Sequence, residues 1–531
     1  MTDTAVRTLP TKNSEQAENR HVKFTDIHDL DVRPGWLTVW RPTPRTPGAT
    51  APWSPDTRPP SYVQEAHLAG ALASRSGAGG SPAWLAAVFE LPGRLDPVAL
   101  EAALLGWIDR HESLRSRLTP LLPDGPEEPD GPEEPSEAPG AGKAAKAEKE
   151  PEKAKECAPP VRRATLRAGA VSFARNVVGH FLDGNELTHR IERLFDTETD
   201  PLAWPSYVFA TVGHADSTTL YLGFDHSNVD GYSILLVAHE IHELYAAARG
   251  GVPARLDEAG SYLDFAALER RAAASVDIQH ATVARWREYL TECGGQLPAF
   301  PSPVGPADEA EARRVDAGGA QRGGCGRLLD AAGTRAFDAA CRAGGGHVPA
   351  GVLAVLALAG RTAAGLADFR VLTPFHTRNR PQWTQSVGWY VGLAPIGFPL
   401  AESDAFPEAL TRAAGALRHA RPAAEVPFAR VTELLGVSVQ PRFVVSYVDM
   451  RQVPGARQWP EWKAAAVRSR RNHAHEVYLW INRTFDGLYV SFRYPDTARG
   501  RSAVPAYIDC AARQMHEVAA TGSREEVLTP C

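Results

Sequence analysis

The feature that most constrains the fold is a strand that runs directly into a polar loop and then into a strong helix. Residues 207–213 and 218–224 are rich in β-branched and aromatic side chains and flank a turn, which predicts a hairpin. The second strand leads at once into residues 225–231, and an amphipathic helix is predicted behind Ser233, its N-cap, until Gly250 and Gly251 end it. The polar cluster therefore lies between a strand end and a helix start, where functional residues are often found.

Helices and strands alternate through the rest of the chain, in two stretches separated by a linker rich in Pro, Gly and Ala. In the first stretch the pattern predicts a helix, a strand and a second helix, at residues 61–73, 84–91 and 97–110. In the second stretch it predicts a helix followed by strands, at residues 348–363, 369–375, 387–400, 441–450 and 475–495. Neither stretch carries a glycine-rich phosphate-binding motif, so an α/β fold without a nucleotide-binding sheet is predicted.

These patterns divide the chain into an extended N-terminal arm (1–60) that contains a β-like stretch at residues 35–40, a first lobe (61–300) and a second lobe (310–525). Residues 123–160 interrupt the first lobe with nine prolines, eleven acidic and five basic residues, and almost no large apolar side chain. Such a segment cannot bury enough surface to order itself, so we expect a disordered surface insertion. A partner-binding acidic segment is the less favoured alternative.

Charge and composition disfavour several classes of protein. The formal net charge is −6, so a generally basic nucleic-acid binder is not expected. No run of about 18 apolar residues predicts a transmembrane helix, and the first residues lack the apolar core of a secretory signal, so a cytoplasmic protein without membrane contact is expected. The six cysteines are scattered, and His239 and His242 have no evident third ligand, so no metal site is predicted.

His226 is the strongest candidate for a chemical role in the polar cluster. An imidazole with a pKa of about 6.5 accepts a proton at neutral pH. Asp230, four residues on, could orient the loop or pair with an arginine, and Gly231 would allow a sharp turn or the close approach of a ligand. The pattern is short, and on the pattern alone a loop with a capping aspartate and an exposed histidine is an equally good interpretation.

Several segments resemble the condensation-domain superfamily, which includes condensation domains of nonribosomal peptide synthetases, polyketide-associated acyltransferases and, more distantly, chloramphenicol acetyltransferase. Residues 225–231 (DHSNVDG) fall where the family carries H-H-x-x-x-D-G. Further resemblances follow in the family's order, at residues 110–115 (RHESLR), 262–266 (YLDFA), 286–290 (WREYL), 373–378 (TPFHTR) and 387–391 (VGWYV). The resemblance covers about residues 60–520.

The resemblance implies two chloramphenicol-acetyltransferase-like lobes in a V-shaped pseudo-dimer, with a channel between them. It implies a free-standing acyltransferase or condensation enzyme of natural-product biosynthesis, without a tightly bound cofactor. The donor would be an acyl thioester, carried by coenzyme A or by the phosphopantetheine arm of a carrier protein, and the acceptor a small amine or alcohol. His226 would be the general base, with Asp230 and Gly231 in the same catalytic motif and Asp230 paired with Arg378. The substrate-binding residues would be Asp225, Ser233, Arg378, Trp389 and Tyr390.

One position departs from the family pattern, because Asp225 stands where the family has its first histidine. Asp225, Asp230 and Ser233 then match the D-x-x-x-x-D-x-x-S pattern of heterocyclisation domains, so a heterocyclisation-type enzyme is one alternative. A non-catalytic interaction protein that keeps the fold is the other. The loss of the first histidine favours this second alternative, and the retained His226 opposes it.

Overall fold

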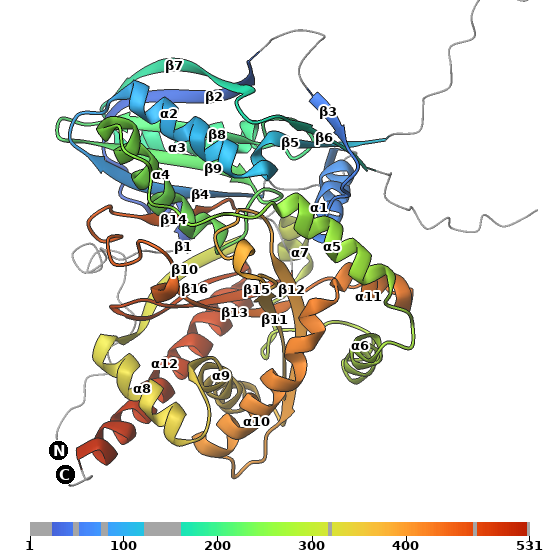
Figure 1. Ribbon diagram of the computed structural model, residues 1–531. Coiled ribbons are helices and arrows are strands. Elements are labelled where there is room, and N and C mark those ends of the chain that lie inside the picture. Colours follow the sequence, from blue (N-terminus) through green and yellow to red (C-terminus); the bar gives the residue numbers. More distant parts are fainter. Residues whose placement is uncertain are drawn as a thin grey trace, which may run out of the picture.

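Two β-sheets, one above the other in Figure 1, organise the chain. The computed structural model describes residues 24–45, 53–75, 83–121, 161–316, 321–470 and 475–527. The expected insertion at 123–160 and the first part of the expected arm lie outside these ranges. Helices pack on both faces of the upper sheet and on the outer face of the lower sheet, which confirms the predicted α/β fold with two lobes.

The upper sheet has seven strands in the order β1-β14-β4-β9-β8-β2-β7. In that order they are Phe24–Asp26, Ala465–Arg468, Trp84–Pro92, Ser217–Asp225, Tyr207–Gly213, Gly35–Pro44 and Val171–Phe181. Apolar clusters cover both faces of this sheet. Because successive side chains of a strand point to opposite sides, each strand contributes to both clusters. In β4, Ala87 and Phe89 join the apolar cluster under helices α2 and α4, whereas Ala86 and Val88 join the cluster under α3. These helices are Pro97–Arg110, Ser233–Gly250 and Gly184–Glu198.

The lower sheet has six strands in the order β10-β16-β15-β13-β11-β12. In that order they are Gln321–Asp330, Gly487–Pro495, Val477–Arg483, Phe443–Asp449, Asp368–His376 and Val391–Pro399. The apolar residues of β15, such as Leu479, face the cluster formed with helices α8, α9, α10 and α12. These helices are Ala331–Ala343, Val348–Ala364, Phe406–Ala420 and Ala498–Val527. The alternate residues of β15, among them Trp480 and Asn482, face the upper sheet instead, and this face is polar.

Smaller elements close the sides of the two lobes. Helices α1, α5, α6, α7 and α11 are Tyr62–Ala73, Tyr262–Ala274, Ala281–Glu292, Glu309–Asp316 and Phe428–Leu435. Strands β3, β6 and β5 form a three-stranded sheet from Trp53–Asp56, Val161–Leu166 and Ser116–Pro120. Short 3-10 helices occur at Ile27–Asp29, Glu112–Arg115, Pro381–Trp383, Arg421–Glu425 and Met450–Gln452. Helices α1, α5 and α11 lie together on the right of Figure 1, where they flank the interface between the sheets.

The two halves of the chain exchange elements. Strand β14 comes from the second half but pairs with β4 of the upper sheet, with Arg468 opposite Leu85. Helix α6 comes from the first half but packs on the lower sheet, where the hydroxyl of Tyr289 lies 3.1 Å from the carbonyl oxygens of both Val371 and Ile396. The sequence boundary between the two predicted lobes therefore stays a prediction, since packing does not follow it.

The β-like stretch predicted at residues 35–40 is confirmed as part of strand β2, whereas β1 and β3 lie in parts of the arm for which no strand was predicted. Strands β1 and β2 belong to the upper sheet, and β3 belongs to the three-stranded sheet. In β2, Leu37 and Val39 are buried on one face and Trp40 on the other, each at most 1% exposed. Both faces of β2 are buried because apolar clusters pack on both sides of the upper sheet.

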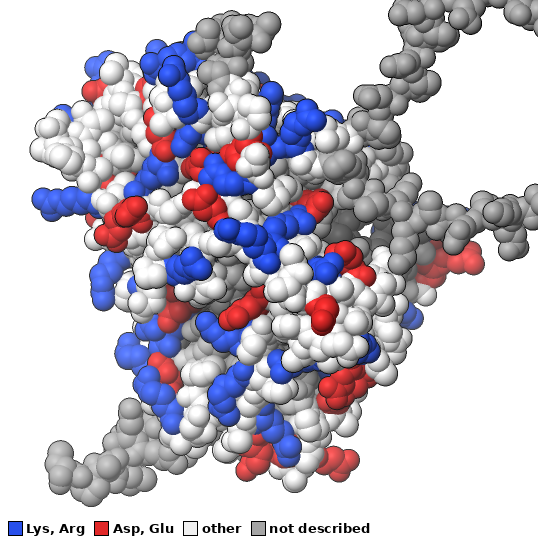
Figure 2. Space-filling view, turned by 45° about the vertical axis from the view of Figure 1, so that its right-hand side comes forward, with Lys and Arg blue, Asp and Glu red and all other residues white. Residues whose placement is uncertain are grey.

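No single helix in the described part of the chain is both long and apolar enough to cross a membrane. Helices α8 and α9 meet the length and hydropathy criteria only together, across a bend of 92°. On the face shown in Figure 2, basic and acidic side chains are interspersed over both lobes.

Candidate active site

A cavity of about 1490 Å³ lies between the two sheets and takes side chains from both. Trp84 and Leu85 of β4, together with His226 in the loop after β9, line it from the upper sheet. Residues 373–380, at the end of β11, and Trp389, just ahead of β12, line it from the lower sheet. The polar loop that the sequence singled out therefore opens into the space between the lobes.

The imidazole of His226 stands at the wall of this cavity. The backbone N–H of His226 donates to the carbonyl oxygen of Ala83 at 2.9 Å, which continues the pairing of β4 with β9 past the end of the strand. Trp389 lies against the imidazole, with 3.9 Å between ring centroids and 33° between ring planes. The side chain is half-buried. A histidine held in this way can reach a bound substrate, which a general base must do.

A buried ion pair joins the two halves of the chain beside His226. Arg378 donates to both carboxylate oxygens of Asp230, from Nη1 at 2.7 Å and from Nη2 at 3.1 Å. The two side chains are 4% and 2% exposed. The backbone N–H groups of Ser233 and Tyr390 donate to the same carboxylate at 2.6 and 2.9 Å. The ion pair predicted from the sequence is present, and it fixes the loop after β9 to the segment ahead of β12.

The surroundings of Asp230 keep it charged. Burial by itself would raise the pKa of the Asp230 carboxyl, because burial disfavours the charged form. The charge of Arg378 and the hydrogen bonds from Arg378 and Ser233 outweigh burial, so the pKa lies below its usual value. A carboxylate that stays ionised does not exchange protons at neutral pH, so Asp230 holds the site in place.

Ser233 has a different role from the predicted one. Helix α4 begins at Ser233, with Tyr232 and not Ser233 at its N-cap, and Asp230 accepts the backbone N–H of Ser233. The hydroxyl of Ser233 donates to the carbonyl oxygen of Gly388 at 2.8 Å and accepts from Arg378 at 2.7 Å. These contacts hold residues 387–390 against α4, so β12 begins after this segment and not at residue 387 as predicted.

The residues expected to bind substrate divide into two groups. Arg378 and Trp389 line the cavity. Asp225, Ser233 and Tyr390 are at most 1% exposed and do not line it. Their polar atoms contact protein groups, as in the hydrogen bond from the hydroxyl of Tyr390 to Ser386 Oγ at 2.7 Å. We therefore assign these three to the support of the cavity wall.

Gly231 lines the cavity without needing the backbone freedom of glycine. Its φ angle is not positive, and a Cβ atom at this position would meet only the ring of Phe24, at 3.7 Å. That distance is an ordinary van der Waals contact. The sharp turn considered from the sequence is therefore not the reason for glycine here, and the close approach of a ligand stays a prediction.

Sequence analysis missed His67, on α1. Its Nε2 atom lies 2.9 and 3.0 Å from the two carboxylate oxygens of Asp225. Asp225 also accepts the backbone N–H of Ser227 at 2.8 Å. No local signal marks His67, because the helix pattern of residues 61–73 does not show what lies opposite it in the fold.

Sequence analysis also missed Glu240, which organises the segment resembling the family's R-H-E-x-L-R motif. Glu240 is fully buried on α4 and accepts from Trp107 at 2.7 Å and from Arg110 at 3.0 Å, and it lies 2.7 Å from His111 Nε2. Burial by itself would raise the pKa of Glu240, but His111 and Arg110 outweigh it and the pKa is lowered. Glu240 therefore ties α2 to α4 within the first lobe.

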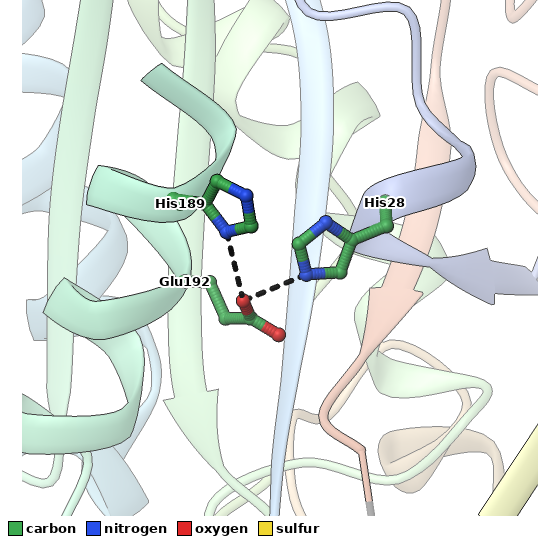
Figure 3. A group of neighbouring side chains, drawn as sticks. All are labelled: His28, His189 and Glu192. Carbon is green, nitrogen blue, oxygen red and sulfur yellow. Dashed lines mark hydrogen bonds and ion pairs between the residues drawn. The ribbon is translucent and has the colours of Figure 1, made fainter. Parts of the chain in front are cut away.

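Among the described residues, one group has the right types and spacing to hold a metal ion, namely His28, His189 and Glu192. Figure 3 shows Glu192 between the two imidazoles, with His28 Nε2 2.7 Å and His189 Nδ1 3.9 Å from the same carboxylate oxygen. Two imidazoles and a carboxylate suit zinc. The group belongs to α3 and the short helix after β1, on the opposite face of the upper sheet from α2 and α4, and none of its residues lines the His226 cavity. The hydrogen bond from His28 to Glu192 ties these two elements together.

The cavity wall has two chemically different parts. Apolar side chains of α1, α5 and α11, such as Val63, Leu268 and Phe428, line one part. Polar and aromatic side chains of β14, β15 and β16 line the other, namely Arg468, Ser469, Tyr478, Trp480, Asn482 and Arg493. In Figure 1 the apolar helices lie at the right of the interface, and β14 and β16 lie further left. The cavity can therefore receive one apolar and one polar molecule.

Comparison with known proteins defines the class to which this fold and site belong. The sequence model of the condensation domain matches residues 185–495, which include His226, Asp230 and Arg378. The chain belongs to the condensation-domain family.

The curated relatives it resembles are acyltransferases. The acyltransferase PapA3 of Mycobacterium tuberculosis is 29% identical over 346 residues, which cover 64% of this chain and 71% of the relative. The trehalose-2-sulfate acyltransferase PapA2 of Mycobacterium bovis and Mycobacterium tuberculosis is 27% identical over 493 residues, which cover 91% of this chain and 95% of the relative. The chain is accordingly an acyltransferase, as its motifs predicted, which disfavours the non-catalytic alternative.

Solved structures share the fold. A PapA2 acyl transferase superimposes with a TM-score of 0.77 at 24% identity and covers 94% of this chain and 99% of its own. The first condensation domain of the calcium-dependent antibiotic synthetase gives a TM-score of 0.61 at 18% identity and covers 87% of this chain and 96% of its own. The two-lobe fold predicted from the resemblance is therefore confirmed.

Proposed function

We propose that the protein transfers an acyl group from a thioester to a hydroxyl or amino group, with His226 as the general base. The observation that carries the proposal is the position of the half-buried imidazole at the wall of a cavity shared by both lobes, beside the ion pair that joins them. Neutral imidazole accepts protons near neutral pH, and a positioned base of this kind contributes roughly 10²–10⁴ in rate.

The proposed reaction needs no covalent intermediate on the enzyme. His226 takes the proton from the acceptor as the acceptor oxygen or nitrogen attacks the thioester carbonyl and forms a tetrahedral intermediate. That intermediate collapses, the carbon–sulfur bond breaks, and the leaving thiolate takes the proton from the imidazolium. The ester or amide and the free thiol are released, and His226 is neutral again.

The two parts of the cavity wall support a division of the substrates. The apolar side chains of α1, α5 and α11 suit a hydrocarbon acyl chain, since each buried CH₂ contributes about 0.8 kcal/mol. The polar part suits a hydroxylated acceptor. The guanidinium carbons of Arg468 and Arg493 lie 4.1 and 5.4 Å from the centroid of the Trp480 ring, and these groups are paired with Asp26 and Glu476. Their remaining N–H groups can donate to an anionic substituent. This agrees with the relative named for trehalose 2-sulfate, so we propose a sugar-like acceptor.

Coenzyme A and the phosphopantetheine arm of a carrier protein present the same thioester, so both remain donors within this proposal. Natural-product biosynthesis as the setting and the cytoplasm as the compartment, both predicted from the sequence, also stay part of it.

The test is product formation by the purified protein from acyl-coenzyme A of graded chain length, with trehalose and trehalose 2-sulfate as acceptors. His226→Ala should keep the parental melting temperature and lose about 10²-fold or more in kcat/KM. The matched control is His516→Ala, an exposed histidine on α12, which should leave activity unchanged.

Near-parental turnover by His226→Ala would contradict the general-base assignment. Activity only with an acceptor that carries an amine beside a hydroxyl or thiol, with a product lighter by one water than the simple amide, would instead favour the heterocyclisation alternative. A parent that is inactive with every acyl-coenzyme A but active with an acylated carrier protein would assign the donor.

A further inference from the structure

His67 and Asp225 form a close contact directly beside the catalytic loop. His67 lies on α1, far from residue 225 in the sequence, and its Nε2 is 2.9 Å from Asp225 Oδ2 and 3.0 Å from Oδ1. The side chains are 13% and 1% exposed. In the tautomer with its proton on Nε2, His67 donates a hydrogen bond to this carboxylate. Together with the N–H of Ser227, His67 satisfies a carboxylate that would otherwise be buried at a high cost.

His67 also contacts the aromatic ring that supports His226. Trp389 packs against His226 on one side, with 3.9 Å between ring centroids. His67 meets the same indole edge-on, with 5.5 Å between centroids and 74° between planes. His67 therefore touches both neighbours that fix the His226 imidazole, the preceding residue Asp225 and the supporting ring of Trp389.

We infer that His67 is a positioning residue for His226 and that it acts through Asp225 and Trp389. The position before His226 carries a carboxylate instead of the histidine expected from the resemblance, and the fold brings an imidazole to that carboxylate from α1. The His67–Asp225 contact fixes the first residue of the loop, and the His67–Trp389 contact limits rotation of the indole. The imidazole of His226 is thereby held in one orientation. This inference rests on the proposed general-base role of His226.

The test is a double-mutant cycle on the full-length protein, with kcat, KM and melting temperature measured for each variant. His67→Ala should lower kcat about tenfold and leave KM for the acceptor within about threefold, because a misoriented base slows the chemical step more than binding. His67→Gln should recover most of kcat, since its amide N–H can still donate to Asp225. His516→Ala is the matched control.

The cycle with Asp225→Ala separates positioning from general damage. If His67 acts through Asp225, the double variant should be no slower than the slower single variant, because coupled residues are not additive. Parental kcat in His67→Ala would overturn the inference. Fully multiplicative losses in the double variant would overturn it as well. Failure of the proposed function would show separately, as parental activity in His226→Ala.

Discussion

Asp230, in the loop before α4, and Glu240, on α4, are buried carboxylates with similar hydrogen-bond partners but different structural roles. Both side chains are at most 2% exposed, both accept hydrogen bonds from an arginine and a further N–H donor, and both have a lowered pKa. The partners of Asp230 include Arg378 and the N–H of Tyr390, from the second half of the chain. The partners of Glu240 are Trp107, Arg110 and His111, all from α2 or its end.

The comparison shows that the structural role of a buried carboxylate depends on which part of the chain supplies its hydrogen-bond donors, and not on whether it is Asp or Glu. Asp230 joins the lobes at the cavity that contains His226, so its loss disturbs the assembly of the site. Glu240 joins two helices of one lobe and does not line the cavity, so its loss disturbs the lobe alone. Both carboxylates cost energy to bury, and their partners offset that cost.

The largest expected effect follows from removing Asp230. Asp230→Ala leaves Arg378 buried without its carboxylate, which should lower the free energy of unfolding by about 3–5 kcal/mol. It also removes the acceptor of the Tyr390 N–H, one of the contacts that hold residues 387–390, so kcat/KM per folded molecule should fall at least tenfold. Denaturant unfolding and steady-state kinetics on the same preparation measure both quantities. A variant as stable and active as the parent would remove the distinction between the two carboxylates.

Glu240→Ala should lower stability but leave activity almost unchanged. It leaves the buried donors of α2 without an acceptor, and the free energy of unfolding should fall by about 3 kcal/mol. Activity per folded molecule should stay within about twofold of the parent, because no partner of Glu240 lines the cavity. Activity is measured at a temperature where both variants are folded. A loss of activity as large as that of Asp230→Ala would contradict the comparison.

Lowering the pH should have a smaller effect on the free energy of unfolding, and this effect should arise from His242, which lies on the same helix as Glu240. Burial lowers the pKa of His242 to about 4, and its ring stacks on Trp462 at 4.1 Å. Between about pH 6.5 and pH 4, His242 is protonated in the unfolded chain but neutral in the folded chain. The free energy of unfolding therefore has its full value above about pH 6.5 and decreases as the pH falls to about 4. The total change is about 3 kcal/mol.

His242→Phe keeps an aromatic ring on Trp462 and should remove this part of the acid sensitivity. The two carboxylates lose their contribution only at lower pH, because their pKa values are depressed and the loss begins below the unfolded values of about 4. Unfolding free energies measured between pH 7 and 4 test this, with His516→Phe as control. An unchanged pH dependence in His242→Phe would assign the acid sensitivity to other groups.

Much of the local structure could be predicted from residue patterns. The helix capped by Asp96, the hairpin at residues 207–225 and the helix ended by Gly251 lie where the patterns place them, because capping, β-branching and glycine conformation act over a few residues. The predictions were wrong where a strand is too short to show a pattern, as in β1 and β3, and where a long-range hydrogen bond moved a boundary, as at Ser233 and β12.

The family and the polar loop with His226 and Asp230 could be predicted from motifs that follow one another along the chain, and the resemblance to the family implied the pairing of Asp230 with Arg378. The contacts of His67 with Asp225, of Glu240 with α2 and of β14 with the upper sheet were found only in the folded structure. Each of these contacts links segments far apart in the sequence. Such contacts follow from the packing of whole sheets and helices, which places a side chain opposite a partner that no local pattern can name.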